Sequence, residues 1–239
     1  MTKPLRPRLL ILDHSLEPEL YGPVHHWARH VPPDTVVDAF RTVDGELPGD
    51  VRAYTHAIVT GSEASINGDD RWIVDACQCV RTLAGAGVPM LGSCFGHQMV
   101  VRALSGKEHV RATATPEFGW VELAWDAAER ARDPIAAALP SPAFVYASHF
   151  DEVCDLQAEW ITLATTARCA HAAIKWTRGP VWGFQHHPEI EPPEGQALYD
   201  GFRTRVDDRR RALMRAAFFP EVRDSLLTPA LVRAFLETA

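Results

Sequence analysis

Hydrophobic residues in this chain occur in short runs of strand length, separated by longer amphipathic stretches. Two of those stretches, residues 69–87 and 96–106, are long enough for helices, and each ends at a glycine, as helices commonly do. Strands that alternate with helices favour a mostly parallel sheet with helices on both faces. We therefore predict an α/β, doubly wound fold. The early strand-like runs are RLLILDHS (8–15), TVVDAF (35–40), HAIVTG (56–61) and VPMLGS (88–93).

Strand-like runs lie closer together in the second half of the chain. Strands at this density, with little helical sequence between them, indicate an antiparallel extension of the sheet. The runs are GWVELAW (119–125), AFVYAS (143–148), EWITLAT (159–165), HAAIKWT (171–177) and VWGFQHH (181–187).

A weak boundary follows these strands at EIEPPEG. Beyond it, residues 196–218 and 228–239 have helical patterns, but neither segment is long enough to make a core of its own. We predict one domain over residues 1–239, with its core at about 8–190 and a C-terminal helical appendage at 191–239. A single α/β domain of this length buries roughly three quarters of its unfolded surface, so a full core is available.

Charge and hydropathy argue against two classes of partner. The formal net charge is −7, and the densest basic segment, RTRVDDRRRALMR, is interrupted by Asp207 and Asp208. A nucleic-acid surface needs a sustained positive face, so we expect no nucleic-acid partner and interpret the segment as a solvated helix face, with a docking surface as the alternative. No apolar run approaches the ~18 residues of a membrane helix, so no membrane association is expected.

The cysteines indicate a reducing compartment. Their number is odd, and their spacing is not that of a disulfide framework. The N-terminal sequence MTKPLRPRLLILDHS lacks the small-residue cleavage site of a secretory signal, and we interpret it as leading into the first strand. We therefore expect a cytoplasmic protein. The cysteines are Cys77, Cys79, Cys94, Cys154 and Cys169.

One cysteine stands between two glycines. Gly92, Cys94 and Gly96 form the pattern G-x-C-x-G after a strand-like run and before a helical one, which is the thiol version of a nucleophile elbow. Such a sharp turn exposes the sulfur, and small flanking residues avoid collisions. The N-terminus of the following helix favours a thiolate, and the amide of Phe95 would face a developing oxyanion. The alternative is a buried structural cysteine in a helix-capping turn.

A histidine with a matching carboxylate lies about 90 residues downstream, in GFQHHPEI. In an extended segment, residues two apart share a face, so His187 and Glu189 point the same way and His186 points to the other side. Pro188 between them stiffens that spacing. The pattern therefore predicts His187 as a base oriented by Glu189. A surface pair is the alternative.

These motifs resemble those of the class I glutamine amidotransferases. PMLGSCFGHQ is similar to the family segment P-x-L-G-x-C-x-G-x-Q, and GFQHHPE to G-x-Q-F-H-P-E, with His186 where phenylalanine is usual. AIVTGSEASI is similar to the family's apolar strand that runs into S-G-G-P. EFGW and SHFDEV resemble segments of the subgroup like the amidotransferase domain of GMP synthase. The resemblance covers roughly residues 8–190.

The resemblance implies a flavodoxin-like doubly wound sheet and a triad of Cys94 as nucleophile, His187 as acid and base, and Glu189 as orienter. Cys94 would attack the side-chain amide of glutamine, and His187 would protonate the departing ammonia and then activate water. Hydrolysis of the γ-glutamyl thioester would release glutamate. The implied substrate is glutamine or another γ-glutamyl compound.

Further site residues follow from the resemblance alone. Gln98 matches a substrate-contacting glutamine, and the amides near Gly61 and Ser62 match the second oxyanion donor. Ser62 and Glu63 replace the family's Gly-Pro there, which keeps the backbone amide but disfavours the φ that a glycine permits. His149 and Asp151 match a loop that borders the glutamine pocket; a loop histidine beside a capping aspartate is the alternative.

Two other clusters could suggest a metal. Cys77 and Cys79 are two apart in a helical stretch, where side chains diverge. His25, His26 and His30 have no carboxylate or cysteine at ligand spacing. We predict neither a metal nor a cofactor.

Three functions remain open. The first is a glutaminase that delivers ammonia to a synthetase or ligase on a separate chain, since the sequence contains no G-x-x-x-x-G-K-[ST] motif. The second is a free-standing γ-glutamyl peptidase or hydrolase, which would use the same thioester chemistry. The third is a catalytically silent binding or regulatory module that keeps the fold.

Overall fold

The computed structural model describes residues 6–223 and 226–238. Its strands are β1 (Arg8–Asp13), β2 (Val36–Arg41), β3 (His56–Val59), β4 (Met90–Ser93), β5 (Val110–Trp125), β6 (Ala143–Val153), β7 (Trp160–Thr165), β8 (Ala173–Trp176), β9 (Val181–Phe184) and β10 (Phe218–Phe219). Its α-helices are α1 (Pro23–Ala28), α2 (Arg71–Gly85), α3 (Phe95–Leu104), α4 (Ala127–Arg132), α5 (Pro134–Ala138), α6 (Pro192–Arg205), α7 (Asp208–Ala216) and α8 (Leu227–Leu236). No helix in these ranges is long and apolar enough to cross a lipid bilayer.

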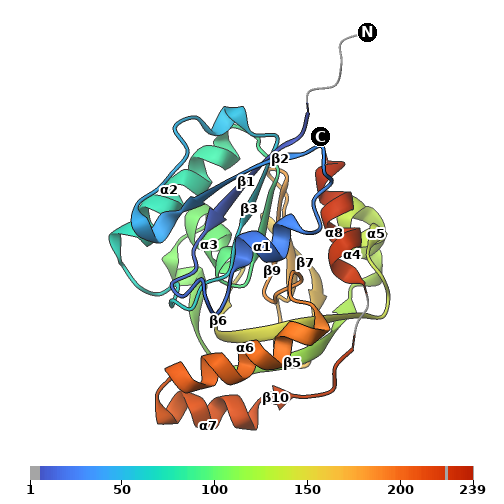
Figure 1. The fold of residues 1–239 in the computed structure, drawn as a ribbon. Helices are drawn as coiled ribbons and strands as arrows, with labels where there is room; N and C mark the ends of the chain where they lie inside the picture. The colour runs from blue at the N-terminus through green and yellow to red at the C-terminus, as the bar shows by residue number, and fades with distance from the viewer. Residues whose placement is uncertain (1–5, 224–225, 239) are drawn as a thin grey trace.

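One mixed sheet forms the centre of the molecule (Figure 1). Its strand order is β10-β5-β7-β8-β9-β4-β3-β1-β2, with β6 paired to β5 outside this path. In the sheet order, the neighbours β9-β4-β3-β1-β2 pair in parallel, whereas the neighbours β9-β8-β7-β5 pair antiparallel. This arrangement confirms the predicted doubly wound, mostly parallel sheet and the antiparallel extension that follows it.

The central strands are apolar on both faces because helices cover both. In β1, Leu10 and Leu12 pack with α2 and α3, whereas Leu9 and Ile11 face a second core cluster. Figure 1 shows α2 and α3 on one side of the sheet and α4, α5 and α8 on the other. The uninterrupted apolar sequence of β1 is therefore the signature of a strand buried on both faces.

The β5–β6 hairpin is longer than the sequence pattern predicts. Its strands extend beyond the expected 119–125 and 143–148, and the pairing register shifts between Ala112 and Glu117. Polar side chains on the exposed face of β5 hide the strand from a search for apolar runs. This extension places Glu117 opposite His149.

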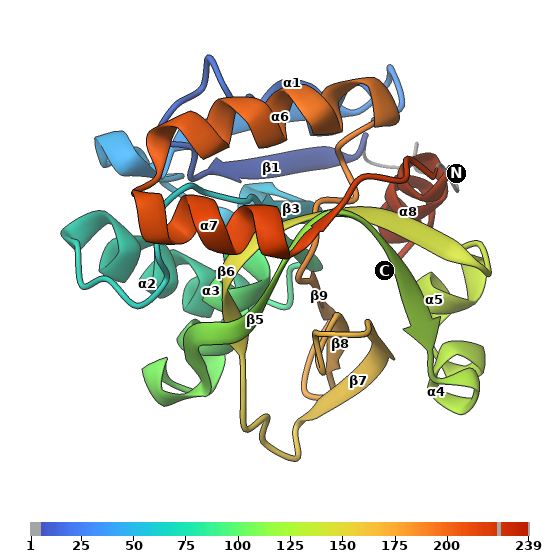
Figure 2. The same ribbon diagram turned by 90° about the horizontal axis from the view of Figure 1, so that it is seen from below.

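The C-terminal helices cover two separate parts of the sheet. Helices α6 and α7 lie along the curved β5–β6 hairpin, where Tyr199 and Met214 pack with Phe118 (Figure 2). Helix α8 returns to the main core and buries Leu231 and Phe235 there completely. The C-terminal helices are therefore packed against the sheet and its β5–β6 extension.

Candidate active site

Cys94 occupies the sharp turn between β4 and α3. Its φ of 49° and ψ of −108° place a non-glycine residue in a strained region of the backbone map. A Cβ atom on Gly96 would lie 1.8 Å from the Val59 carbonyl oxygen, and one on Gly92 would lie 2.5 Å from the Gly96 carbonyl oxygen. Both glycines are thus required by close backbone contact, as the G-x-C-x-G pattern predicts.

The imidazole of His187 reaches this thiol from the loop after β9. The His187 amide donates to the Tyr146 carbonyl at 2.8 Å, which ties the loop to β6. The imidazole of His187 is near enough to Cys94 for a thiolate there to raise the pKa of His187, and the Cys94 thiol donates to the Ser148 carbonyl oxygen at 3.6 Å. The two distant motifs of the sequence therefore meet at one end of the sheet.

Glu189 contacts a ring nitrogen of His187, so that the Cys94 thiol, the His187 imidazole and the Glu189 carboxylate form a row. Its Oε1 lies 2.9 Å from His187 Nδ1, and the carboxylate is fully buried. The Tyr21 hydroxyl donates to the same oxygen at 2.5 Å. Sequence reasoning missed Tyr21, because it lies outside every motif, 168 residues away from the carboxylate it contacts.

The electrostatics of the row favour a charged imidazole. Burial alone would lower the pKa of His187, but the negative charges of a Cys94 thiolate and of Glu189, with the hydrogen bond to Glu189, raise that pKa well above its ordinary value. A thiolate beside an imidazolium is the nucleophile and acid pair that acyl transfer needs.

Two backbone segments could stabilise an oxyanion beside the thiol. Phe95 is the first residue of α3, so its amide has no partner inside the helix. Gly61 follows β3, and a Cβ atom there would lie 2.7 Å from His187 Cε1. Among the described residues only Cys94, Asp155 and Leu226 combine a side chain with a positive φ, so Ser62 stands in the loop without that strain.

Two hollows meet at the thiol and the imidazole. The polar pocket is bordered by Cys94 and by four charged or amide side chains, those of Glu63, Gln98, Asp151 and Arg210. The apolar pocket is bordered by His187 and by six apolar or aromatic side chains, those of Leu20, Tyr21, Tyr146, Ile190, Leu198 and Phe202. They enclose about 430 Å³ and about 420 Å³ that no protein atom fills, including the space where each opens to solvent.

The three predicted substrate contacts lie at or behind the polar pocket. Gln98 Nε2 donates to the Asp151 carbonyl at 2.8 Å, which joins α3 to β6. The Asp151 carboxylate accepts hydrogen bonds from Ser65 and Asn67 on the loop after β3. The ring of His149 is engaged elsewhere, with Nδ1 at 3.0 Å from the Asp151 carbonyl oxygen. Their contact with a substrate remains a prediction.

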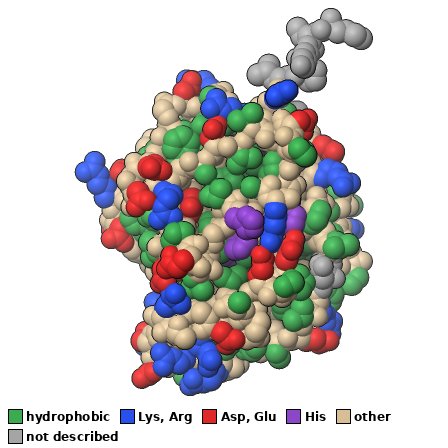
Figure 3. Space-filling model, in the orientation of Figure 1, with side chains coloured by type: hydrophobic (Ala, Val, Ile, Leu, Met, Phe, Trp, Pro, Cys, Tyr) green, Lys and Arg blue, Asp and Glu red, His purple; other side chains and the backbone are tan. Residues whose placement is uncertain are grey.

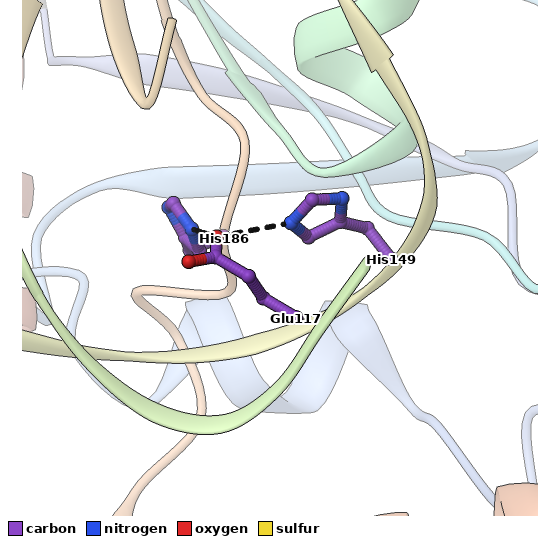
Figure 4. A group of neighbouring side chains, drawn as sticks. All are labelled: Glu117, His149 and His186. Carbon is purple, nitrogen blue, oxygen red and sulfur yellow. Dashed lines mark hydrogen bonds and ion pairs between the residues drawn. The ribbon is translucent and has the colours of Figure 1, made fainter. Parts of the chain in front are cut away.

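Behind His149 lies a buried cluster that the sequence did not reveal. Glu117 Oε2 lies 3.3 Å from His149 Nε2 and 3.1 Å from His186 Nε2, and Figure 4 shows the carboxylate between the two rings. Thr166 donates to the other carboxylate oxygen. The ligand atoms of Glu117, His149 and His186 lie within 4.8 Å of one another, so this cluster could hold a metal ion. Hydrogen bonds account for the contacts as they stand, and the absence of a metal remains a prediction.

Hydrogen bonds dominate the charge state of this cluster. Burial would raise the pKa of Glu117, but its bonds to His149, His186 and Thr166 hold that pKa well below its ordinary value. Burial lowers the pKa of His186 more than Glu117 raises it. The folded protein therefore keeps Glu117 ionised and His186 neutral near pH 7.

The other cysteine and histidine clusters have structural surroundings. Cys77 and Cys79 are buried on α2, and burial raises the pKa of Cys79 to about 11. On α1, Arg29 pairs with Glu194 at 2.6 Å and donates to the Glu189 carbonyl. The nearby His26 and His30 lie 3.6 Å and 3.5 Å from acidic side chains of the segment that starts α6. Figure 3 shows histidine, basic and acidic side chains gathered at the centre of this face.

The variant His186→Phe tests the buried cluster. Loss of one donor to a buried carboxylate should lower the free energy of unfolding by about 1–3 kcal/mol at pH 7. In the wild type, His186 binds a proton below about pH 6.5 in the unfolded chain but stays neutral in the folded protein. Lowering the pH therefore lowers the free energy of unfolding, by up to about 1.4 kcal/mol per pH unit from this residue. The variant should lack that contribution. Denaturant unfolding between pH 7 and pH 5 measures both effects.

His25→Gln, at an exposed position of α1, is the matched control. It should leave the stability at pH 7 and the acid dependence as in the wild type. Equal acid slopes for His186→Phe and the wild type would show that His186 does not resist protonation in the folded protein.

The comparisons with known proteins agree with this geometry. The family model Glutamine amidotransferase class-I matches residues 55–203. A subunit of glutamine-hydrolyzing GMP synthase from Methanothermobacter thermautotrophicus is 30% identical over 161 residues, which are 67% of this chain and 83% of that protein. Gamma-glutamyl peptidase 4 from Arabidopsis thaliana is 39% identical over 83 residues, 34% of this chain and 33% of the relative.

Other relatives are much longer than the matched part. The match to the glutamine-hydrolyzing GMP synthase from Syntrophomonas wolfei, 32% identical over 133 residues, covers 56% of this chain but only 24% of that protein. Among solved structures, a glutamine amidotransferase from Thermotoga maritima has a TM-score of 0.75 at 17% identity, covering 98% of this chain and 99% of the other, which shows a shared fold. On the family match, this chain is an enzyme that belongs to the class I glutamine amidotransferases.

Proposed function

We propose that this enzyme hydrolyses the side-chain amide of glutamine through a γ-glutamyl thioester on Cys94. The observation that supports this most strongly is the row of thiol, imidazole and carboxylate at the mouth of two pockets. The Cys94 thiolate would attack the amide carbon, and the oxyanion would be held by the amides of Phe95 and the Gly61–Ser62 segment. Collapse would break the C–N bond, and ammonia would leave with a proton from His187. Water activated by the neutral His187 would then release glutamate and restore the thiol.

The polar pocket suits the head group of this substrate. Free glutamine carries an ammonium and a carboxylate, and the pocket offers Glu63 and Asp151 on one hand and Arg210 on the other. Glu63 Oε2 accepts from the Leu16 amide at 2.8 Å, and its buried Oε1 has no partner in the described structure. We therefore propose Glu63 as a contact of the ammonium, in addition to the contacts predicted for Gln98, His149 and Asp151.

We further propose that the ammonia is used by a synthetase on a separate chain in the cytoplasm. The relative from Methanothermobacter supports this proposal, because its name describes one subunit of a glutamine-hydrolyzing synthase. The second candidate function, a free-standing γ-glutamyl peptidase or hydrolase, is supported by the relative from Arabidopsis and by the apolar pocket, which ammonia would not fill.

Labelling with an electrophilic glutamine analogue tests the catalytic role of Cys94. Cys94 borders the polar pocket, where the analogue would bind, whereas Cys77 and Cys79 are buried on α2, so the analogue should modify Cys94 stoichiometrically at pH 7 while Cys77 and Cys79 remain unmodified. Peptide mass spectrometry measures the site, and Cys94→Ser is the control. An unmodified Cys94 in folded wild-type protein would favour the catalytically silent module instead.

Substrate comparison separates the two enzymatic candidates. A glutaminase that serves a synthetase should hydrolyse glutamine faster when cell extract supplies that partner, whereas a free-standing peptidase should hydrolyse a γ-glutamyl dipeptide at the same rate with or without extract. Glutamate release is the readout in both assays. Extract from which a co-purifying synthetase has been removed is the control for the first candidate.

Tyr21→Phe tests the support of the orienting carboxylate. A hydrogen bond to a charged group contributes roughly 1.5–3 kcal/mol, so its loss should lower kcat for glutamine by about 10- to 100-fold with little change in KM. Tyr199→Phe is the matched control, since Tyr199 stacks on Phe218 and borders neither pocket. An unchanged kcat in Tyr21→Phe would contradict the role of this bond.

A further inference from the structure

The two pockets divide the substrate at the bond that breaks. Cys94 borders the polar pocket and His187 borders the apolar pocket. Four side chains border both, namely Ser62, Glu63, Ser148 and Phe202. The nucleophile attacks the acyl carbon, and the acid must face the nitrogen that leaves. In the proposed function, the γ-glutamyl group therefore fills the polar pocket, and whatever the nitrogen carries points past His187 into the apolar pocket.

The walls of the apolar pocket define the chemistry of that substituent. Leu198 and Phe202 are four residues apart on α6 and so share one face of the helix. They lie opposite Tyr21 and Leu20, which precede α1, while Ile190 lies at the start of the segment that leads to α6. Figure 2 shows α6 running beside α1. A site with such walls binds an alkyl or aromatic group by the hydrophobic effect.

The charge around the pocket excludes one class of substituent. Glu63 and His187 are the charged side chains that border it, and neither lysine nor arginine does so among the described residues. His187 is already paired with Glu189, and it gives its proton to the amine that leaves. The carboxylate of an amino-acid leaving group would therefore enter apolar surroundings beside Glu63, without an unpaired cation. An uncharged amine avoids that cost.

The wall formed by α6 is held in place by contacts away from the reacting atoms. Glu191 and Glu194 form a capping box at the start of the helix, and Arg29 of α1 binds both Glu194 and the Glu189 carbonyl. The same helix therefore carries the pocket wall and is tied to the residue that orients His187.

From these contacts we propose that the enzyme cleaves γ-glutamyl amides of apolar amines, with the amine bound between α6 and the Tyr21 segment. This inference rests on the proposed thioester chemistry at Cys94. The thiolate bonds to the amide carbon, the C–N bond breaks, and the amine leaves with the proton of His187. Water then hydrolyses the thioester, so the products are glutamate and the free amine.

A matched series of amides tests the leaving-group site. The probes are glutamine, γ-glutamyl methylamide, γ-glutamyl isoamylamide and γ-glutamyl-leucine, whose leaving group is isoamylamine with a carboxylate added. Each buried methylene-sized group contributes about fourfold. We expect kcat/KM for the isoamylamide to exceed those for the methylamide and for γ-glutamyl-leucine at least tenfold each. A value no higher than that of the methylamide would overturn the proposal.

Leu198→Trp should fill the pocket and lower the isoamylamide-to-methylamide ratio of kcat/KM at least tenfold. Ala197 is the preceding residue of α6 and is exposed, so Ala197→Trp adds a tryptophan outside the pocket and should leave the ratio unchanged. An unchanged ratio in Leu198→Trp would contradict the assigned location.

Two readouts separate this inference from the proposed function. If Cys94 reacts with the electrophilic glutamine analogue but the amide series is flat, the leaving-group site is wrong and the thioester chemistry stands. If no amide is hydrolysed, the affinity of the Cys94→Ala variant for each amide of the series can be measured by calorimetry instead. An affinity that rises at least tenfold from methylamide to isoamylamide supports the pocket, and a flat series overturns it.

Discussion

The close backbone contact at the turn before α3 is the constraint on which the site depends. Gly96 lies so near the Val59 carbonyl that any side chain there would collide with β3. This contact lets α3 begin directly behind the strand, with Cys94 held in a strained conformation at the helix N-terminus. The strain is maintained because the Cys94 amide also donates to the Phe184 carbonyl of β9. The parallel strands therefore fix the nucleophile before any substrate binds.

The rest of the site is brought to that turn by three separate segments. The loop after β9 supplies His187 and Glu189, the segment before α1 supplies Tyr21, and β6 supplies the carbonyls that receive the thiol and the His187 amide. Glu189 contacts both Tyr21 and His187, so its buried charge has two partners. Such shared contacts explain why a row of ionisable groups can persist in the interior: each charge is offset by its neighbour.

The sequence predicted the parts of this account that depend on local patterns. The central strands were predicted from short apolar runs, and helices α2 and α3 from amphipathic stretches that end at a glycine. The shared face of His187 and Glu189 was predicted because side chains two residues apart point the same way in an extended chain. The sequence could not predict contacts made only by tertiary packing. Tyr21 is a tyrosine among ordinary loop residues, and Glu117 meets His149 and His186 because β5 pairs with β6 in one particular register. The C-terminal helices were predicted from their own patterns, but the surfaces they pack against, β5 for α6 and α7 and the second face of the sheet for α8, were not.

The thioester itself is the most direct test of the central claim. Wild-type enzyme mixed with glutamine and quenched in acid within the first turnover should carry a γ-glutamyl adduct on Cys94, detected by intact-mass and peptide mass spectrometry. Hydrolysis of glutamine with no adduct at any quench time, or an adduct on a different cysteine, would contradict the account.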